Sequence, residues 1–357
     1  MSIQIETTFN RICQQAAEQR ASEIYLLTAQ PPFVRVDGQM QSLAKENVLS
    51  ASFIEGLLSD LLDEDQKREL EKKKQVTVIK EIGRVGNSQI SVYYQKGALS
   101  LRIKLLTREI IDLAKLEAPE VVKKFTKIKK GIVFITGPRD SGRSTLVVSL
   151  LNDINKREAK FISTIEKPIK TVLSGLKSVV EQREVGKDVD SFLSGLGSIR
   201  ERNIDVVMIS QIEDAQVMNE LFAIAEAGSL VFAVIDTESA IKTLKRILRF
   251  YPADEEDNVR YFLSENLGGI ICSRLVPKIG GGRIRALEIL SATPAVKSII
   301  AGGKFHQLAG ILQASEDRTA ISLDQYLADL VSSGGVMAEE ALKYCANEEV
   351  FRSLLRR

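Results

Sequence analysis

The segment "GPRDSGRSTL" at residues 137–146 has most of the pattern of a loop that binds nucleotide phosphates. Such loops read G-x-x-x-x-G-K-[ST], and Gly137, Gly142 and Ser144 stand at the expected spacing, with Arg143 at the lysine position. Glycines let backbone N–H groups approach phosphate oxygens, and the serine hydroxyl is a ligand for Mg²⁺. Arginine keeps the positive charge, but its planar guanidinium does not replace an ammonium group at a tight phosphate site. The spacing therefore predicts nucleotide binding, and the arginine predicts that phosphoryl transfer is impaired.

The surrounding sequence supports this interpretation of the loop. An apolar run, "GIVFIT", precedes it, and "STLVVSLLNDINK" follows it with helical spacing, so the loop joins a strand to a helix. The expected ligand is ATP, with Ser144 as a weak ligand for Mg²⁺. The residues expected to contact the nucleotide are Gly137, Pro138, Ser141, Gly142, Arg143, Ser144 and Thr145. The alternative is a glycine turn that only connects the two elements.

The length and composition of the chain limit the classes of protein to which it can belong. A chain of 357 residues exceeds one ordinary core and predicts two domains. The 49 basic and 47 acidic residues give a net charge of +2, which indicates neither a nucleic-acid partner nor an acidic membrane surface. The three cysteines follow no metal or redox spacing, and neither a signal peptide nor a membrane span is recognisable. We therefore expect a cytoplasmic protein with free thiols.

Two domains and a helical tail are expected. Residues 1–112 predict a small α/β domain, with helices at 3–20, 51–62 and 63–74 and strands with β-branched and aromatic residues around them. Residues 113–290 alternate short apolar strands with helical segments, which is typical of a mostly parallel sheet covered by helices. Residues 291–357 predict a mostly α-helical tail. The overall fold class is α/β.

The motifs, in this order, resemble those of the twitching-motility (PilT-type) pilus retraction ATPases of the type II/IV secretion superfamily. The resemblance runs almost from end to end, and its matching segments are "ASEIYLLTAQPPFVRVDG", "GPRDSGRSTL", "TIEKPIK", "EQREVG", "AEAGSLVF", "YPADEEDNVRYFLSENL", "GGGR" and "TPAVKSII". It implies a PAS-like N-terminal domain, a RecA-like P-loop NTPase domain with a helical tail, and a hexameric ring at the cytoplasmic base of a pilus.

The sequence departs from this family at the positions that carry its chemistry. The glutamate that polarises the attacking water aligns with Gln211, which can orient a water molecule but cannot accept its proton. The acidic box keeps Glu166 but carries Lys167 and Lys170 in place of acidic residues, and the histidine box carries Ser229 and Asp236 in place of histidines. Trapping substitutions made in a laboratory would explain Arg143 and Gln211, but not all of these changes together. We therefore interpret them as natural degeneration, with Gln211 and Asp236 as degenerate catalytic positions and Glu166 as a retained one.

The family's N-terminal domain supplies arginines that reach the phosphates of a neighbouring subunit. Lys96 and Lys104 stand where such arginines fall, together with Asn87 and Gln89. The resemblance implies that the two lysines are the candidate contacts in trans, with Arg102 as a substitute on the same strand face. An arginine finger is worth about 10³–10⁵ in turnover, so its loss would matter.

The resemblance and the departures together predict a nucleotide-binding pseudo-ATPase that assists or regulates type IV pilus retraction and twitching motility through a paralogous motor. Expected partners are further subunits in a homo- or hetero-hexamer with that paralogous pilus ATPase, and the inner-membrane pilus platform protein. The expected location is cytoplasmic, with peripheral attachment at the pilus base. One alternative is a slow, active hexameric retraction motor. A RecA-like nucleic-acid protein is a third hypothesis, which the absence of a basic stripe disfavours.

Overall fold

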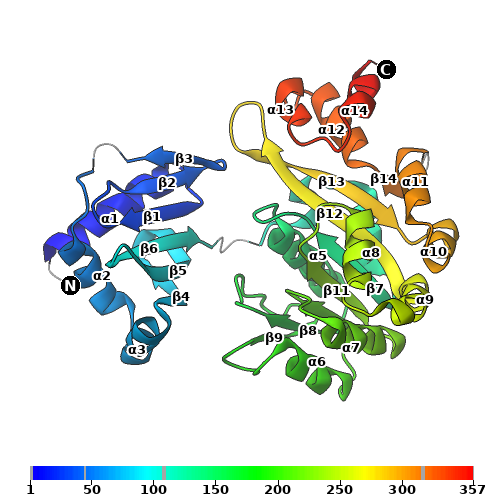
Figure 1. Cartoon of the computed structure of the whole chain (residues 1–357), viewed down its shortest axis with the longest axis horizontal. Coiled ribbons are helices and arrows are strands. Elements are labelled where there is room, and N and C mark those ends of the chain that lie inside the picture. Colours follow the sequence, from blue (N-terminus) through cyan, green and yellow to red (C-terminus); the bar gives the residue numbers. More distant parts are fainter. Residues whose placement is uncertain (1–2, 44–45, 107–109, 315–317, 357) are drawn as a thin grey trace. The chain divides into compact units, whose positions relative to one another are not determined.

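The computed structural model of the chain describes residues 3–43, 46–106, 110–314 and 318–356. The chain divides into two units, Met1–Glu109 and Ile110–Arg357, and each unit has its own sheet (Figure 1). The sequence analysis placed the boundary at residue 112, within a polar connection expected over residues 108–130. Residues 108 and 109 of that connection lie outside the described residues.

The first unit contains a six-stranded antiparallel sheet in the order β3-β2-β1-β6-β5-β4. Its strands are β1 (Glu23–Leu27), β2 (Phe33–Val36), β3 (Gln39–Ser42), β4 (Gln75–Ile82), β5 (Gly86–Gln95) and β6 (Ala98–Leu105), and its helices are α1 (Ile3–Glu18), α2 (Ala51–Leu61) and α3 (Glu64–Lys73). Alternate residues of β5 and β6, such as Ile90 and Ile103, are fully buried and pack with Ile12 of α1. This period-2 pattern is why the strands were recognisable from the sequence.

The second unit contains an eight-stranded sheet in the order β14-β13-β12-β7-β11-β10-β8-β9. Its strands are β7 (Gly131–Thr136), β8 (Phe161–Glu166), β9 (Val179–Glu184), β10 (Val206–Ile209), β11 (Leu230–Ile235), β12 (Leu267–Pro277), β13 (Arg283–Ser291) and β14 (Ala320–Ile321). Six adjacent strands of the sheet run parallel, in the spatial order β9, β8, β10, β11, β7 and β12. The remaining two strands, β13 and β14, are antiparallel to their neighbours. The expected mostly parallel sheet is present.

Two strands of this sheet correct the sequence analysis. The segment of β12, which contains Gly268 and Gly269, was not identified as a strand. A Cβ at Gly269 would lie 2.3 Å from the Phe125 ring, so the glycine serves close packing within the strand. The strand "RALEIL" was expected among the parallel strands, but it forms part of β13, which a short turn connects to β12. Antiparallel pairing follows from that short connection.

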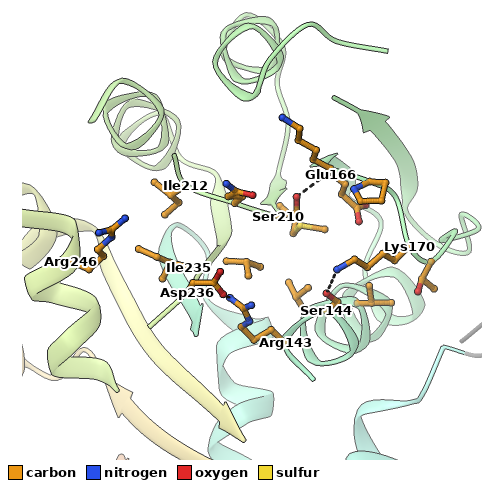
Figure 2. A pocket seen from close by; sticks show the side chains of 17 residues that line it. Arg143, Ser144, Glu166, Lys170, Ser210, Ile212, Ile235, Asp236 and Arg246 are labelled. Atoms are coloured by element: carbon orange, nitrogen blue, oxygen red, sulfur yellow. Dashed lines mark hydrogen bonds and ion pairs between the residues drawn. The ribbon is translucent and has the colours of Figure 1, made fainter. Parts of the chain in front are cut away.

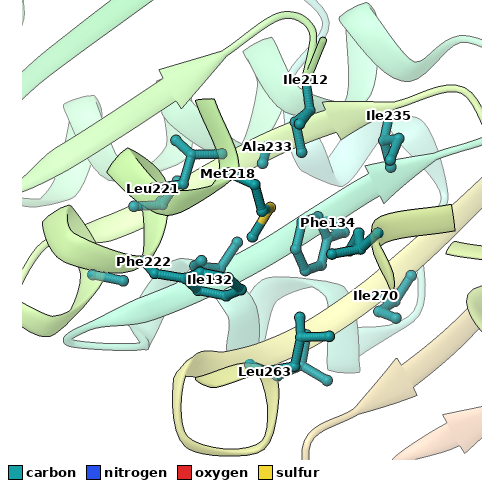
Figure 3. Packing of buried hydrophobic residues seen from close by; sticks show 14 of the residues in the cluster. Ile132, Phe134, Ile212, Met218, Leu221, Phe222, Ala233, Ile235, Leu263 and Ile270 are labelled. Atoms are coloured by element: carbon teal, nitrogen blue, oxygen red, sulfur yellow. The ribbon is translucent and has the colours of Figure 1, made fainter. Parts of the chain in front are cut away.

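Helices cover both faces of the second sheet, and alternate residues of β7 point to opposite faces. Ile132 and Phe134 belong to a core with Met218 and Phe222 of α7, and Figure 3 shows this packing. Val133 belongs to the other core, which includes residues of α5 and α12. The helices of this unit are α4 (Glu120–Lys124), α5 (Arg143–Arg157), α6 (Phe192–Arg200), α7 (Ala215–Glu226), α8 (Ala240–Leu248), α9 (Glu256–Asn266), α10 (Pro294–Ala301), α11 (Leu308–Ala314), α12 (Leu323–Ser332), α13 (Ala338–Leu342) and α14 (Glu348–Leu355). A strand buried on both faces reads as a continuous apolar run, as "GIVFIT" does.

The C-terminal segment 291–357 is part of the second unit rather than a separate body. Its helices α12 and α14 contribute Leu327 and Phe351 to one core of the sheet, and β14 pairs with β13. Residues 315–317 of the predicted tail lie outside the described residues. Among the described residues, no helix is both long and apolar enough to cross a membrane.

Candidate functional site

The loop at 137–142 connects β7 to α5, and its two glycines have conformations that other residues rarely adopt. Gly137 has φ 143°, and a Cβ there would lie 2.3 Å from the Ser273 carbonyl oxygen and 2.5 Å from Ser141 Oγ. Gly142 has φ 82° and is the N-cap of α5. Both positions therefore favour glycine for their backbone conformation, and Gly137 also requires it for space.

The loop offers polar groups that suit an anion. The first N–H groups of the 15-residue helix α5 have no partner within the helix, and the helix dipole favours negative charge at this end. Ser141 is 3 % exposed, and its Oγ has no hydrogen-bond partner among the residues that the structure describes. The loop thus fits a phosphate chain. The remaining predicted contacts, Pro138 and Thr145, lie in the loop and in the first turn of α5.

A buried arginine supports the loop from the β12–β13 hairpin. Arg285 Nη1 donates to the Gly142 carbonyl oxygen at 3.1 Å and to Ser273 Oγ at 2.5 Å, and Ser273 Oγ donates to the Ser141 carbonyl oxygen at 2.7 Å. Burial lowers the pKa of the Arg285 guanidinium to about 10. The loop conformation is therefore held by side chains from beneath as well as by its own glycines.

A cavity of about 270 Å³ lies beside the loop, at the carboxyl ends of β8, β10 and β11. Figure 2 shows its lining, which includes most of the chemically relevant residues that the sequence singled out: Arg143, Ser144, Glu166, Lys167, Lys170, Gln211 and Asp236. Carboxyl ends of parallel strands are the usual ligand-binding edge of an α/β sheet. The predicted catalytic positions Glu166, Gln211 and Asp236 are thus brought together around one cavity.

The arginine at the lysine position is paired with the residue at a degenerate histidine position. Arg143 Nη1 forms an ion pair with the carboxylate of Asp236, and this pair is drawn in Figure 2. The Arg143 side chain is 16 % exposed, whereas that of Asp236 is 61 % exposed. The guanidinium charge is therefore partly neutralised before any phosphate arrives.

The other position of the histidine box is elsewhere. Ser229 lies at the opposite end of β11 from Asp236, and its Oγ donates to the Ile204 carbonyl oxygen at 2.7 Å. It is not among the residues that line the cavity. Of the two replaced histidines, only the one at Asp236 bears on the candidate site.

Glu166 is a buried carboxyl at the end of β8. Thr164 Oγ1 donates to its Oε1 at 2.8 Å, and Gln182 Nε2 donates to the same oxygen at 2.9 Å. Burial raises the pKa of Glu166, although these two hydrogen bonds and the positive charge of Lys170 act in the opposite direction. One oxygen of this carboxyl already accepts two hydrogen bonds, so the group is less available to a metal ion than an unpaired carboxylate.

Gln211 follows β10 and lines the cavity, as its predicted role requires. The residue before it, Ser210, has a structural partner, because the backbone N–H of Lys167 donates to Ser210 Oγ at 3.0 Å. This bond ties the segment after β8 to the end of β10. Gln211 is an amide, so it can orient a water molecule but cannot take a proton from it.

The residues around Ser144 fit Mg²⁺ poorly. Lys170 Nζ lies 3.5 Å from Ser144 Oγ, on the hydroxyl that would serve as the metal ligand (Figure 2). Mg²⁺ requires oxygen ligands at about 2.0–2.1 Å in octahedral geometry, and a nearby ammonium repels it. The two carboxyls that line the cavity, Glu166 and Asp236, are engaged with other side chains. The loop fits phosphate, but the wall opposite does not fit the metal.

The N-terminal candidates lie in the first unit. Lys96 is in the turn between β5 and β6, with φ 51°, and Lys104 is on β6. Arg102, the suggested substitute, is an ion-pair partner of Glu23, which is 2 % exposed and also binds Arg35. These guanidinium groups and the Tyr25 hydroxyl lower the pKa of Glu23 despite its burial. Arg102 therefore has an internal structural role in this unit.

Three residues at the site were not foreseen from the sequence. They are Arg246, which lines the cavity from α8, Arg285 beneath the loop, and Gln182, which holds Glu166. One signal was available for Arg285. A charged residue inside the buried apolar run of β13 is uncommon and indicates a specific partner.

Comparisons with known proteins agree with this geometry. The family described as "Type II/IV secretion system protein" matches residues 2–282. The type IV pilus retraction ATPase PilT of Pseudomonas aeruginosa is 31% identical over 326 residues, which cover 91% of this chain and 94% of that protein. The type IV pilus ATPase PilU of the same organism is 28% identical, covering 98% of this chain and 91% of that protein.

A solved structure extends the likeness to three dimensions. The crystal structure of the pilus retraction motor PilT with bound ADP has a TM-score of 0.83 and 33% sequence identity, covering 95% of this chain and 97% of that one. This match confirms the expected fold class, a PAS-like α/β domain followed by a RecA-like P-loop NTPase domain with a helical tail. The chain belongs to the type II/IV secretion system protein family, as a member of the PilT/PilU-type secretion ATPases.

Proposed function

We propose that this chain is a nucleotide-binding pseudo-ATPase that assists type IV pilus retraction and twitching motility through a paralogous, catalytically intact motor. The ion pair between Arg143 and Asp236 is the observation that carries this proposal. In a working phosphate loop the basic residue contacts the phosphates, whereas here its charge is directed to a carboxylate of the same chain. ATP would have to compete with Asp236 for the guanidinium.

The general base supports the same conclusion. Gln211 stands where a carboxylate is expected, and loss of a general base costs about 10²–10⁴ in rate. Hydrogen bonds from Thr164 and Gln182 hold the carboxyl of Glu166 in place, so it does not replace the missing general base at the position of Gln211. We infer that nucleotide binds at Gly137–Thr145 and is hydrolysed slowly or not at all.

We further propose that the chain assembles with copies of itself or with the paralogue as a hexamer at the cytoplasmic base of the pilus, next to the inner-membrane platform protein. The names of the relatives support this placement, since PilT and PilU are type IV pilus ATPases. In such a ring Lys96 and Lys104 would face a neighbour's phosphates. Ammonium groups cannot reproduce the bidentate contacts of arginine, so activity of the homo-oligomer would be further reduced.

An ATPase assay on the purified chain, alone and mixed with an active paralogue, tests the proposal. We expect negligible turnover alone and co-elution with the paralogue in size-exclusion chromatography. Restoring Arg143→Lys, Gln211→Glu, Lys167→Asp, Lys170→Glu and Asp236→His together should recover some activity in a mixed ring that supplies arginines. Rapid turnover by the unmodified chain, abolished by Gln211→Ala, would contradict the proposal.

The second candidate is a slow but active retraction motor. It is favoured by Gln211, which lines the cavity and could position the attacking water as glutamines do in other nucleotide hydrolases. Single-turnover hydrolysis of radiolabelled ATP distinguishes the two. A slow rate that falls with Gln211→Ala supports the motor, and an unchanged trace supports the pseudo-ATPase.

A further inference from the structure

The cavity contains a positively charged side chain at the position where a phosphate loop normally holds its metal. Lys170 Nζ lies 3.5 Å from Ser144 Oγ, and the picture of the site shows the lysine extending from the opposite wall to the start of α5 (Figure 2). This contact is long for a hydrogen bond, but the position of the charge is what matters. An ammonium carries three donors and can contact phosphate oxygens directly.

The backbone that carries Lys170 is anchored on both sides by side chains of β9. The Ile169 N–H donates to Glu184 Oε2 at 3.1 Å. Gln182 accepts from the Leu173 N–H at 2.6 Å and donates to the Thr171 carbonyl oxygen at 3.0 Å. Three hydrogen bonds within five residues therefore fix the backbone segment that presents Lys170 to the cavity.

The charges of the lining also favour a metal-free anion. Four cationic side chains line the cavity, from Arg143, Lys167, Lys170 and Arg246, against the two carboxyls of Glu166 and Asp236. Both carboxyls already have partners. A nucleoside triphosphate without Mg²⁺ carries more negative charge than its Mg²⁺ complex, so it gains more from a cationic lining.

We propose that this pocket binds nucleoside triphosphate without Mg²⁺, with the ammonium of Lys170 beside Ser144 acting as the counter-ion that the metal would otherwise supply. This inference rests on the proposed nucleotide binding at the loop. It explains why the acidic box carries lysines while the glycine framework is intact. The ligand class is the free polyphosphate anion of a nucleotide.

The test measures the affinity of the full chain for a fluorescent ATP analogue, once in excess Mg²⁺ and once in EDTA. For the unmodified chain we expect the two dissociation constants to differ by less than about threefold. Lys170→Met removes the ammonium and retains the stem, and it should weaken binding in EDTA by about tenfold. Lys170→Glu should create a metal requirement, with binding in Mg²⁺ at least about tenfold tighter than in EDTA.

Lys167→Glu is the matched control for Lys170→Glu. It makes the same change of charge in the lining of the same cavity, but among the described residues its ammonium has no hydrogen bond or ion pair with Ser144 or any other group. We expect it to weaken binding in Mg²⁺ and in EDTA by the same factor. A metal requirement created by both substitutions would overturn the specific role of Lys170.

A direct readout of the metal completes the experiment. Electron paramagnetic resonance with Mn²⁺ in place of Mg²⁺ should show only the spectrum of Mn²⁺ bound to ATP in solution, with no signal from Mn²⁺ bound at the protein. The Lys170→Glu variant should add a signal from protein-bound Mn²⁺. Binding of ATP only in the presence of metal would overturn this inference and leave the nucleotide-binding function intact. Binding in neither condition would overturn both.

Discussion

The two sides of the candidate nucleotide cavity differ in how closely they follow the family pattern. The loop side retains Gly137, Gly142 and a backbone conformation that fits phosphate. The opposite wall carries Lys170, Gln211 and Asp236 where the resemblance implies acidic, glutamate and histidine residues. The difference shows which features of a site are set by packing and which by side-chain chemistry alone.

The loop is constrained by its neighbours, since any side chain at Gly137 would overlap Ser273 and Ser141. The wall residues line a cavity of about 270 Å³, so a different side chain there can extend into open space without displacing packed neighbours. Substitutions at the wall should therefore change the free energy of unfolding little, whereas substitutions at the loop glycines should lower it strongly. Four variants test this contrast.

Gly137→Ala should have the largest effect. Its Cβ would lie 2.3 Å from a backbone oxygen at φ 143°, so we expect a loss of at least about 3 kcal/mol in the free energy of unfolding and no nucleotide binding. Chemical denaturation of the full chain measures it. Gly281→Ala is the control, because it has φ 96° and open space around it, and it should cost about 1–2 kcal/mol. Equal losses for the two variants would refute the steric explanation.

Arg285→Met should have an intermediate effect. It removes the two hydrogen bonds that the guanidinium donates, to the Gly142 carbonyl oxygen, which still accepts from the Leu146 N–H, and to Ser273 Oγ. Their loss costs about 1–3 kcal/mol, partly offset because a buried guanidinium no longer needs to be charged. We expect a lower melting temperature and faster amide exchange at 137–142. Arg274→Met is the control on the other strand of the hairpin, since its Nη2 donates to the Glu238 carbonyl oxygen instead. Unchanged exchange in the loop of Arg285→Met would show that the loop needs no support from beneath.

Asp236→Asn should change nucleotide affinity more than stability. The pair with Arg143 is largely exposed on the carboxylate side, so the unfolding free energy should change by less than about 1 kcal/mol. Freed from its partner, Arg143 becomes available to phosphate, and we expect ATP affinity to rise by about fivefold. Glu238→Gln, which removes a neighbouring carboxylate that pairs with Lys242, is the control and should leave affinity unchanged. An affinity that falls in Asp236→Asn would contradict the proposed competition.

Glu166→Gln should have the smallest effect, and it should depend on pH. Burial raises the pKa of Glu166 above its ordinary value of 4.5, so between these two values the folded chain holds a proton that the unfolded chain releases. The stability of the unmodified chain should therefore fall, relative to the variant, as pH rises from 4.5 through the raised pKa. Melting temperatures of both proteins over this range provide the measurement. A difference that stays constant with pH would mean that Glu166 titrates normally.

Much of the fold was predictable because its signals are local. The strand, loop and helix around residues 137–146 follow from an apolar run, two glycines and a helical pattern. The candidate catalytic positions Glu166, Gln211 and Asp236 could be identified by resemblance, and the parallel sheet brings their strand ends together.

The contacts that define the state of the site were not predictable. The pair of Arg143 with Asp236 and the approach of Lys170 to Ser144 depend on side-chain conformations across the cavity. The role of Arg285 depends on an antiparallel hairpin whose first strand, β12, was not identified from the sequence. Local pattern identifies elements, whereas these contacts join elements that are distant in sequence.

The contact between Arg285 and Gly142 has a consequence for how such a sequence evolves. Gly142 has φ 82°, and a Cβ there would lie 2.9 Å from the Arg285 guanidinium nitrogens that donate to its own carbonyl oxygen, so the fold itself favours this glycine. This part of the phosphate-loop signature is therefore under a structural constraint that does not depend on hydrolysis. A related protein that no longer binds ATP would still carry this part of the motif. Counting motor proteins by the motif alone would therefore include proteins that are not motors.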